Sequence, residues 1–237
     1  LFAIILMNTF GVSGNLMSLG ALDFGLITTV QTYSVVATSV TTSCVNSMTG
    51  SVGVAVNPLP AVYNVTGGGS YCAGGTGVTI DLDNSDMSAS YQLFLGGTPV
   101  GPVVTGTGLP ITFGLQTAAG TYTVEATNPL GCSETMASFA TISIDPLPNA
   151  YIVTGGGSYC SGGTGVHVGL SGSVVGVEYQ LFNGSAVGLP VAGTGLALDF
   201  GTFTVAGTYT VIATNTTTTC INAMMGSAVI SISPLPT

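Results

Sequence analysis

The sequence contains no lysine, no arginine, no tryptophan and a single histidine among its 237 residues. Charged residues make up 4% of the chain and the formal net charge is −9, whereas an average soluble domain has about 25% charged residues. Because no basic side chain can neutralise phosphates, the composition argues against binding to nucleic acid or to an anionic membrane surface. Lysine chemistry, including Schiff bases and isopeptide cross-links, is excluded in this segment.

The chain also lacks a long hydrophobic run, although 46% of its residues are apolar. These residues are scattered among glycine, threonine and serine, and no stretch approaches the roughly 20 apolar residues of a membrane-spanning helix. The opening run, residues 1–7, is short and is followed by Asn8. It has neither the basic segment nor the cleavage site of a signal peptide. We therefore expect no membrane insertion and interpret residues 1–7 as interior sequence of a repeat.

What the chain does contain is a tandem repeat. The motif Gly-Thr-Tyr-Thr-Val-x-Ala-Thr-Asn occurs at residues 120–128 and 207–215, and a related motif occurs at residues 32–38. A cysteine follows each copy at a period of 88 residues: Cys44, Cys132 and Cys220. A fixed period indicates one structural unit copied along the chain. The predicted units are residues 1–60, 61–148 and 149–237.

Each complete unit is predicted to be an antiparallel β-sandwich. In residues 149–237, short runs alternate apolar with polar or small residues, as in Val166 to Leu170, and turn signals such as Asn183-Gly184 separate them. About seven such strands fit in the unit, and residues 61–148 repeat the pattern. This density of short strands is typical of an immunoglobulin-like sandwich, so the predicted fold class is all-β.

Residues 1–60 match only the later part of the unit. Residues 22–25 repeat as residues 198–201, and the same count places Ala3 at the position of Tyr179. The first two strands are therefore expected to be missing. A sandwich without them exposes its core and its sheet edges. We expect the chain to be a segment of a longer array, with the first unit completed by upstream chain or by a neighbouring copy.

Cysteine spacing predicts one disulfide in each complete unit. Cys72 and Cys132 lie 60 residues apart, as do Cys160 and Cys220. Closing a loop of this size would stabilise a unit by roughly 4 kcal/mol in the chain-entropy model. By the same spacing, the partner of Cys44 is expected 60 residues earlier, before the first residue given, and a free thiol or an intermolecular bridge is the competing interpretation. Repeated bridging cysteines indicate an oxidising compartment outside the cytoplasm.

Two tyrosines and the histidine are interpreted as structural. Tyr122 and Tyr209 stand near the start of the sixth strand, a position that suits a tyrosine corner, in which the hydroxyl bonds to nearby backbone. His167 aligns with Thr79 on the outward face and is expected to be exposed. As the single histidine, it is not expected to form a catalytic triad or a multi-histidine metal site.

One acidic cluster, formed by Asp81, Asp83 and Asp86, could bind Ca²⁺. The equivalent stretch of the next unit, residues 169–174, has no carboxylate, so a solvated strand end is the favoured interpretation. The glycine-rich segments precede strands and no lysine follows them, which argues against phosphate binding. We therefore expect no metal, nucleotide or other cofactor.

The motifs together resemble a known type of repeat. The pattern V-T-G-G-G-S-Y-C-x-G-G-T-G-V, then Y-Q-L-F, then G-T-Y-T-V-x-A-T-N, then C and P-L-P resembles the Ig-like repeats of very large secreted surface proteins of Bacteroidota. The resemblance covers residues 61–237 and the later part of residues 1–60. It implies an immunoglobulin-like sandwich, export, and often a C-terminal sorting domain for type IX secretion, which is not visible here. Such repeats serve as stalks and spacers.

These features predict a structural segment of an extracellular or cell-surface protein that forms a stalk or filament and is not an enzyme. The expected partners are copies of the chain or further repeats of the same polypeptide. An adhesin that binds carbohydrate or cell surfaces is the alternative, and it would need exposed aromatic residues or a metal site concentrated in one unit. An accessory region of an enzyme would require a catalytic domain elsewhere.

Overall fold

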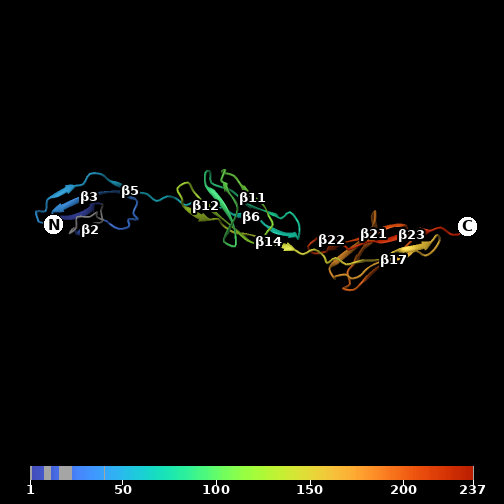
Figure 1. Cartoon of the computed structure of the whole chain (residues 1–237). Helices are drawn as coiled ribbons and strands as arrows, with labels where there is room; N and C mark the ends of the chain where they lie inside the picture. Colours follow the sequence, from blue (N-terminus) through green and yellow to red (C-terminus); the bar gives the residue numbers. More distant parts are fainter. Residues whose placement is uncertain (1, 8–11, 16–22, 40, 237) are drawn as a thin grey trace. The chain divides into compact units, whose positions relative to one another are not determined.

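The structure is a computed structural model that describes residues 2–7, 12–15, 23–39 and 41–236 (Figure 1). Every regular element in these residues is a β-strand, and the strands form sheets that are almost entirely antiparallel. The predicted all-β class is therefore confirmed. The chain divides into two compact units, which are described separately: residues 1–60 with 130–132, and residues 61–129 with 133–237.

Residues 61–148 form one sandwich of two sheets. The larger sheet has the order β10-β9-β12-β14-β7, with β13 beside β12, and the smaller sheet has the order β11-β8-β6. The strands are β6 (Val65–Gly67), β7 (Gly69–Cys72), β8 (Val78–Leu82), β9 (Ser90–Leu95), β10 (Thr98–Thr105), β11 (Ile111–Gln116), β12 (Gly120–Thr127), β13 (Ser133–Thr135) and β14 (Ala140–Asp145).

Residues 149–237 form a second sandwich with the same topology. Its larger sheet has the order β19-β18-β21-β23-β16, with β22 beside β21, and its smaller sheet has the order β15-β17-β20. The strands are β15 (Val153–Gly155), β16 (Gly157–Cys160), β17 (Val166–Leu170), β18 (Val177–Asn183), β19 (Ser185–Ala192), β20 (Leu198–Phe203), β21 (Gly207–Asn215), β22 (Ile221–Ala223) and β23 (Ala228–Ser233).

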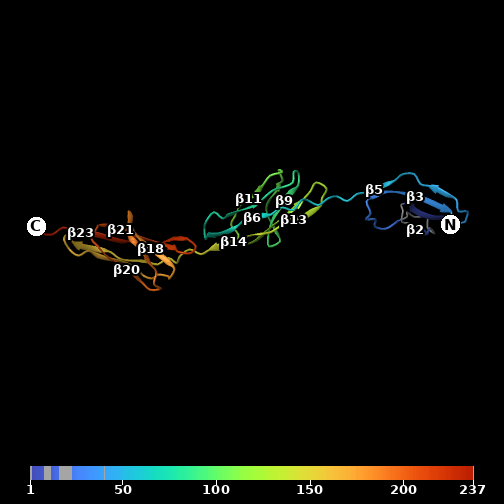
Figure 2. The same ribbon diagram turned by 180° about the vertical axis from the view of Figure 1, so that it is seen from behind.

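The strands of each sandwich form two layers (Figure 1; Figure 2), and buried side chains from both sheets form its core. In β12, Tyr122, Val124 and Ala126 are fully buried, whereas the residues between them are not, as the period of two along a strand requires. Ile80 and Leu82 of β8, in the smaller sheet, are also fully buried and belong to the same core. Full burial of a side chain of this size stabilises the fold by about 1.5–3 kcal/mol.

The first strand of each sandwich crosses from one sheet to the other at three glycines. Gly67, Gly68 and Gly69 have φ angles of 85°, 77° and 124°, where L side chains are disfavoured. Before the crossing, β6 pairs with β8; after it, β7 pairs in parallel with β14 at the edge of the larger sheet. From the sequence, this glycine-rich segment was expected only to precede a strand, not to contain one. The crossing adds the edge strand β7, and the short strand β13 beside β12 is a further addition, so a unit has nine strands, β6 to β14, rather than about seven.

Residues 1–60 contain one sheet of the same kind, with the order β2-β1-β3-β4 and β5 beside β3. The strands are β1 (Phe2–Met7), β2 (Val12–Asn15), β3 (Gln31–Ser39), β4 (Val45–Ser47) and β5 (Val52–Val54). Residues 23–30 form no strand, so the described part of this unit has no second sheet. Leu1 and Leu22, which the sequence alignment used, lie outside the described residues.

The strand register corrects the alignment of the first unit by one residue. Ala37 of β3 faces Ile4, whereas the equivalent Ala213 of β21 faces Tyr179. Ile4, not Ala3, is therefore the counterpart of Tyr179. The count failed because the stretch between Ile4 and residue 23 is one residue shorter than its counterpart between Tyr179 and residue 199.

The glycine crossing makes a direct prediction for Gly155, which has a φ of 89°. A Cβ there would lie 2.1 Å from the carbonyl oxygen of His167, whereas a Cβ at Gly162, with a φ of 82°, would meet nothing within 4 Å. We expect Gly162→Ala to cost about 1–2 kcal/mol for its backbone conformation alone. Gly155→Ala should cost about 2–5 kcal/mol, because the clash adds to this. Denaturant unfolding followed by tyrosine fluorescence measures both, and equal losses would contradict the crossing geometry.

Candidate functional site

The main candidate site is a disulfide that joins the two sandwiches. Cys72 of the first is bonded to Cys220 of the second across 148 residues, with a Cα–Cα distance of 5.5 Å, which lies within the usual range of such bonds. This finding corrects the predicted pairs Cys72–Cys132 and Cys160–Cys220. The prediction that cysteines bridge was right for Cys72 and Cys220, but their partners were wrong.

A bridge within one unit fails because its two cysteines lie at opposite ends of one sheet. Cys72 ends β7 and faces Asp145 at the end of β14. Strand β12 begins near the same end of the sheet, since Gly120 faces Ile142 of β14. It then extends toward the other end of the sheet for eight residues, and Cys132 follows in the loop after it. Eight residues of strand span about 23 Å. A disulfide requires Cα atoms within about 7 Å.

The second sandwich repeats this arrangement. Cys160 ends β16 beside Ser233, and Cys220 follows the far end of β21. Cys160 is an exposed free thiol, and so is Cys44 in the loop between β3 and β4. Cys132 lies in the loop between β12 and β13, with its Sγ 4.0 Å from the carbonyl oxygen of Asn57.

The tyrosines have the hydrogen bonds expected of tyrosine corners. The hydroxyl of Tyr122 donates to the carbonyl oxygen of Ala118 at 2.8 Å, and that of Tyr209 donates to Val205 at 2.9 Å. Burial raises the pKa of Tyr122 above its ordinary value. Tyr33 forms a third such corner, which was not predicted: its hydroxyl donates to the carbonyl oxygen of Thr29, four residues back, at 3.1 Å. The signal was present, because Tyr33 stands in the third copy of the repeated text.

The acidic cluster fixes the segment that leads into β6. The carboxylate of Asp86 accepts hydrogen bonds from the Tyr63 hydroxyl at 2.7 Å and from the Ala61 amide at 2.8 Å. The carboxylate of Asp83 accepts two from Asn64, at 2.9 and 2.8 Å. Within the described ranges, no three His, Cys, Asp or Glu side chains are grouped to hold a metal ion. The structure therefore gives Asp83 and Asp86 a structural role, while Asp81 lies on β8.

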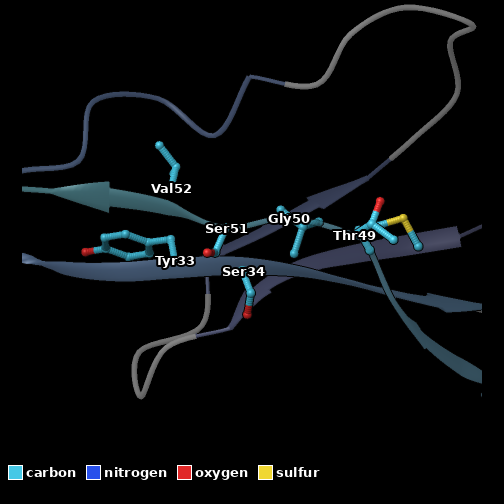
Figure 3. A pocket seen from close by; sticks show the side chains of 8 residues that line it. Tyr33, Ser34, Thr49, Gly50, Ser51 and Val52 are labelled. Atoms are coloured by element: carbon cyan, nitrogen blue, oxygen red, sulfur yellow. The ribbon is translucent and has the colours of Figure 1, made fainter.

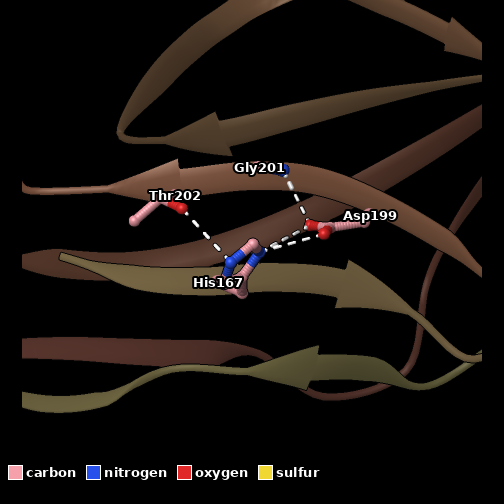
Figure 4. A network of polar contacts seen from close by, with 4 residues as sticks. All are labelled: His167, Asp199, Gly201 and Thr202. Atoms are coloured by element: carbon pink, nitrogen blue, oxygen red, sulfur yellow. Dashed lines mark hydrogen bonds and ion pairs between the residues drawn. The ribbon is translucent and has the colours of Figure 1, made fainter. Parts of the chain in front are cut away.

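His167 forms a small polar network on the outward face of β17 and β20 (Figure 4). Its Nδ1 lies 2.9 Å from Asp199 Oδ2, and its Nε2 lies 3.3 Å from Thr202 Oγ1. The backbone amide of Gly201 and then His167 hold the pKa of Asp199 below its ordinary value.

The order Thr202, His167, Asp199 matches that of a hydrolytic triad, a juxtaposition that the sequence analysis did not anticipate. The side chains of His167 and Asp199 are 68% and 61% exposed, however. In a hydrolytic triad the carboxylate is buried, and its hydrogen bond to the imidazole, shielded from water, fixes the tautomer and orientation of the ring. We interpret the network as a surface contact, in agreement with the predicted exposure of His167.

A cavity of about 340 Å³ lies against the sheet of the first unit (Figure 3). It is lined by Tyr33, Ser34, Val35, Met48, Thr49, Gly50, Ser51 and Val52. Met48 is 39% exposed, whereas its counterpart Met136 is 3% exposed. The residue after Met136, Ala137, donates its amide to the carbonyl oxygen of Tyr63 at 2.8 Å. The cavity thus corresponds to the place where the segment before β6 packs in a complete sandwich.

In the part of the chain that the structure describes, no helix has the length and apolar content of a membrane span.

Comparison with known proteins gives structural likenesses only. No family model matches the chain, and no curated protein matches it. Solved structures similar to it include that described as "Ca2+-stabilized adhesin helps an Antarctic bacterium reach out and bind ice", with 15% identity and a TM-score of 0.49, covering 100% of this chain and 66% of that one. Another concerns "host cell surface retention of a 1.5-MDa bacterial ice-binding adhesin", with 13% identity, a TM-score of 0.41 and coverages of 98% and 87%.

A third similar structure contains the fibronectin(III)-like modules of Clostridium thermocellum CbhA. It is 12% identical, with a TM-score of 0.38, and the match covers 73% of this chain and 95% of that one. Because the sequence identities and TM-scores of these similar structures are low, the fold of this chain is assigned from its own strands and sheets.

The Cys72–Cys220 bond predicts a specific peptide map and a stability change. Digestion of the non-reduced protein with chymotrypsin should join the peptides that carry these two cysteines. Closing 148 residues stabilises the native state by up to about 5 kcal/mol in the chain-entropy model, so Cys220→Ser should lower the unfolding temperature. Cys44→Ser, at an exposed free thiol, is the matched control and should leave it unchanged. A Cys72–Cys132 peptide pair would contradict the assignment.

The bond between Tyr63 and Asp86 predicts a pH dependence. Donation to the Asp86 carboxylate raises the pKa of Tyr63 to about 12. A folded-state pKa above the unfolded value of about 10 gives stability that is complete below pH 10 and lost as the pH rises through 12. NMR of labelled tyrosine rings should show Tyr63 titrating near pH 12, and Asp86→Asn should return it toward 10. Titration near 10 with Asp86 intact would refute the contact.

The hydrogen bonds that Asp83 accepts shift a pKa in the opposite direction, and they predict a dependence of stability on acid pH. The side chain and backbone of Asn64 hold the pKa of Asp83 below its ordinary value. A folded-state pKa below the unfolded value gives stability that is present above the unfolded pKa and lost as the pH falls through the folded one. Asp83→Asn should therefore make the unfolding temperature fall less steeply as the pH is lowered. The same fall in the variant and in the unmodified chain would contradict this assignment. Ser171→Ala, at the equivalent place in the next unit, is the control.

Proposed function

We propose that this chain is a tension-bearing repeat segment of an extracellular bacterial surface protein, a stalk or filament module without a catalytic role. The observation that carries the proposal is the disulfide between successive sandwiches, Cys72–Cys220. A disulfide of this kind persists in an oxidising compartment, which supports export from the cytoplasm. The repeat motifs support a relationship to large surface proteins of Bacteroidota exported by type IX secretion.

The bond changes how the chain carries force. In the sequence, Cys72 lies near the beginning of residues 61–148 and Cys220 lies near the end of residues 149–237. A pull on the two ends of residues 61–237 therefore passes through the disulfide and bypasses the residues between the two cysteines, 73–219. These residues cannot be drawn out while the bond is intact. A stalk benefits from this property, because its length then stays nearly constant under load.

The boundaries 1–60, 61–148 and 149–237 are part of the proposal. So is the completion of the first unit by further polypeptide, either upstream chain or a neighbouring copy. The cavity beside Thr49 supports it, because the counterpart Ala137 is bridged there by the strand-like segment around Asn64. An adhesin that binds carbohydrate or cell surfaces ranks second. It would need exposed aromatics or a metal site, and the carboxylates of Asp83 and Asp86 already accept hydrogen bonds.

Single-molecule stretching from the two termini tests the proposal. Reduction should add the contour length of the chain between Cys72 and Cys220, which are separated by 148 positions, about 490–530 Å at 3.3–3.6 Å per residue. Cys72→Ser should show that added length without reductant, and Cys44→Ser should behave as the unmodified chain does. If the oxidised chain already extends to the length of the Cys72→Ser variant, the disulfide carries no load and the stalk proposal loses its support.

A further inference from the structure

We propose that Cys160 is a linkage site that forms a disulfide with the loop cysteine of a further unit of this repeat, repeating the Cys72–Cys220 joint. Cys44 is the second half of such a joint in this chain. The inference rests on the proposed stalk function and deepens it, because it names the residues through which units beyond the first joint would connect. Two independent comparisons within the structure support it.

The first comparison is between Cys160 and the bonded Cys72. Each ends the edge strand after the glycine crossing and faces the last strand in parallel register, Cys160 opposite Ser233 and Cys72 opposite Asp145. In both units, the backbone amide of the residue after the cysteine donates to the carbonyl oxygen of the residue that the cysteine faces. The distance is 2.9 Å from Ser161 to Ser233 and 2.8 Å from Ala73 to Asp145. In both units, the amide of the glycine three residues after the cysteine, Gly163 or Gly75, donates to the cysteine's own carbonyl oxygen at 2.9 Å. The two sites have one backbone geometry, and Cys160 is exposed and free.

The second comparison is between Cys44 and the bonded Cys220. The Ser39 amide donates to the carbonyl oxygen of Cys44 at 2.8 Å, and the Ser43 amide donates to that of Ser39 at 2.8 Å. The same two bonds, both 2.9 Å long, join the counterparts Asn215, Thr219 and Cys220. Ser43 and Thr219 share a left-handed backbone, with φ angles of 59° and 60°. Cys220 is fully buried in its bond, whereas Cys44 is exposed and free.

The arrangement favours a head-to-tail joint over other pairings. Cys160 cannot reach Cys220, because the nine residues of β21 separate the two ends of the sheet. A bond between two copies of Cys160 would be symmetric and would join like ends. The Cys72–Cys220 joint instead uses two different surfaces, and repeated contacts of that kind build an open chain.

The chemistry requires an oxidant, which we identify as a low-molecular-weight disulfide such as oxidised glutathione. The Cys160 thiolate attacks one sulfur of the oxidant, forming a mixed disulfide and releasing one glutathione thiolate. The thiolate of the loop cysteine then attacks the Cys160 sulfur and releases the second. Two thiols are oxidised, one disulfide is reduced, and both thiol protons end on the released glutathione.

The full chain tests the joint with a second copy as the partner. Incubation with oxidised and reduced glutathione should give a ladder of oligomers on non-reducing gels, and peptide mapping should join Cys160 to Cys44. Cys160→Ser and Cys44→Ser should each stay monomeric alone. A mixture of these two variants should give dimers and no longer species, because each copy then carries one half of the joint. Cys132→Ser is the matched control and should give the full ladder.

A second arm tests a further unit of the same polypeptide. In a chain extended after Thr237 by another copy of residues 149–237, Cys160 should bond to the appended counterpart of Cys220, with Cys72–Cys220 intact. A bond in this arm alone assigns the joint to consecutive units of one chain, and a ladder in the first arm assigns it to separate copies. If Cys160 stays reduced in both arms, or pairs with another Cys160, the inference is overturned. The stretching result for Cys72–Cys220 would be unaffected by that outcome.

Discussion

The crossing of the first strand at three glycines is the constraint on which the rest of the structure depends. Gly67, Gly68 and Gly69 adopt backbone angles that disfavour side chains, and they let one strand close the edges of both sheets. The crossing also carries Cys72 to the end of the sandwich where β14 finishes. Without it, β7 would not pair with β14 and Cys72 would not face Asp145.

The consequence is a unit with one cysteine at each end. Because Cys72 and Cys132 lie at opposite ends of the same sheet, they cannot bond to each other within the unit. The Cys72–Cys220 bond shows one such pairing between consecutive sandwiches. This bond is a covalent link between consecutive sandwiches, which fits the proposed role of a stalk.

The side chains that first suggested chemistry have structural roles instead. Asp83 and Asp86 hold the segment that leads into β6, and the buried tyrosines fasten the starts of β12 and β21. The first unit keeps the tyrosine corner, at Tyr33. Its described residues include one sheet, and a cavity lies where the segment before β6 packs in the complete units.

The sequence by itself determined the all-β class, because alternating burial along a strand follows directly from alternating side-chain character. It also determined the 88-residue period, the tyrosine corners and the exposure of His167. It could not determine the disulfide partners, because a period of 88 makes a cysteine and its copy in the next unit equivalent in spacing. Only the tertiary structure decided between them, since strand direction and register set which cysteines lie at the same end of a sandwich. The register of Ile4 was likewise decided by hydrogen-bond pairing across strands, which a count of residues along one strand does not contain.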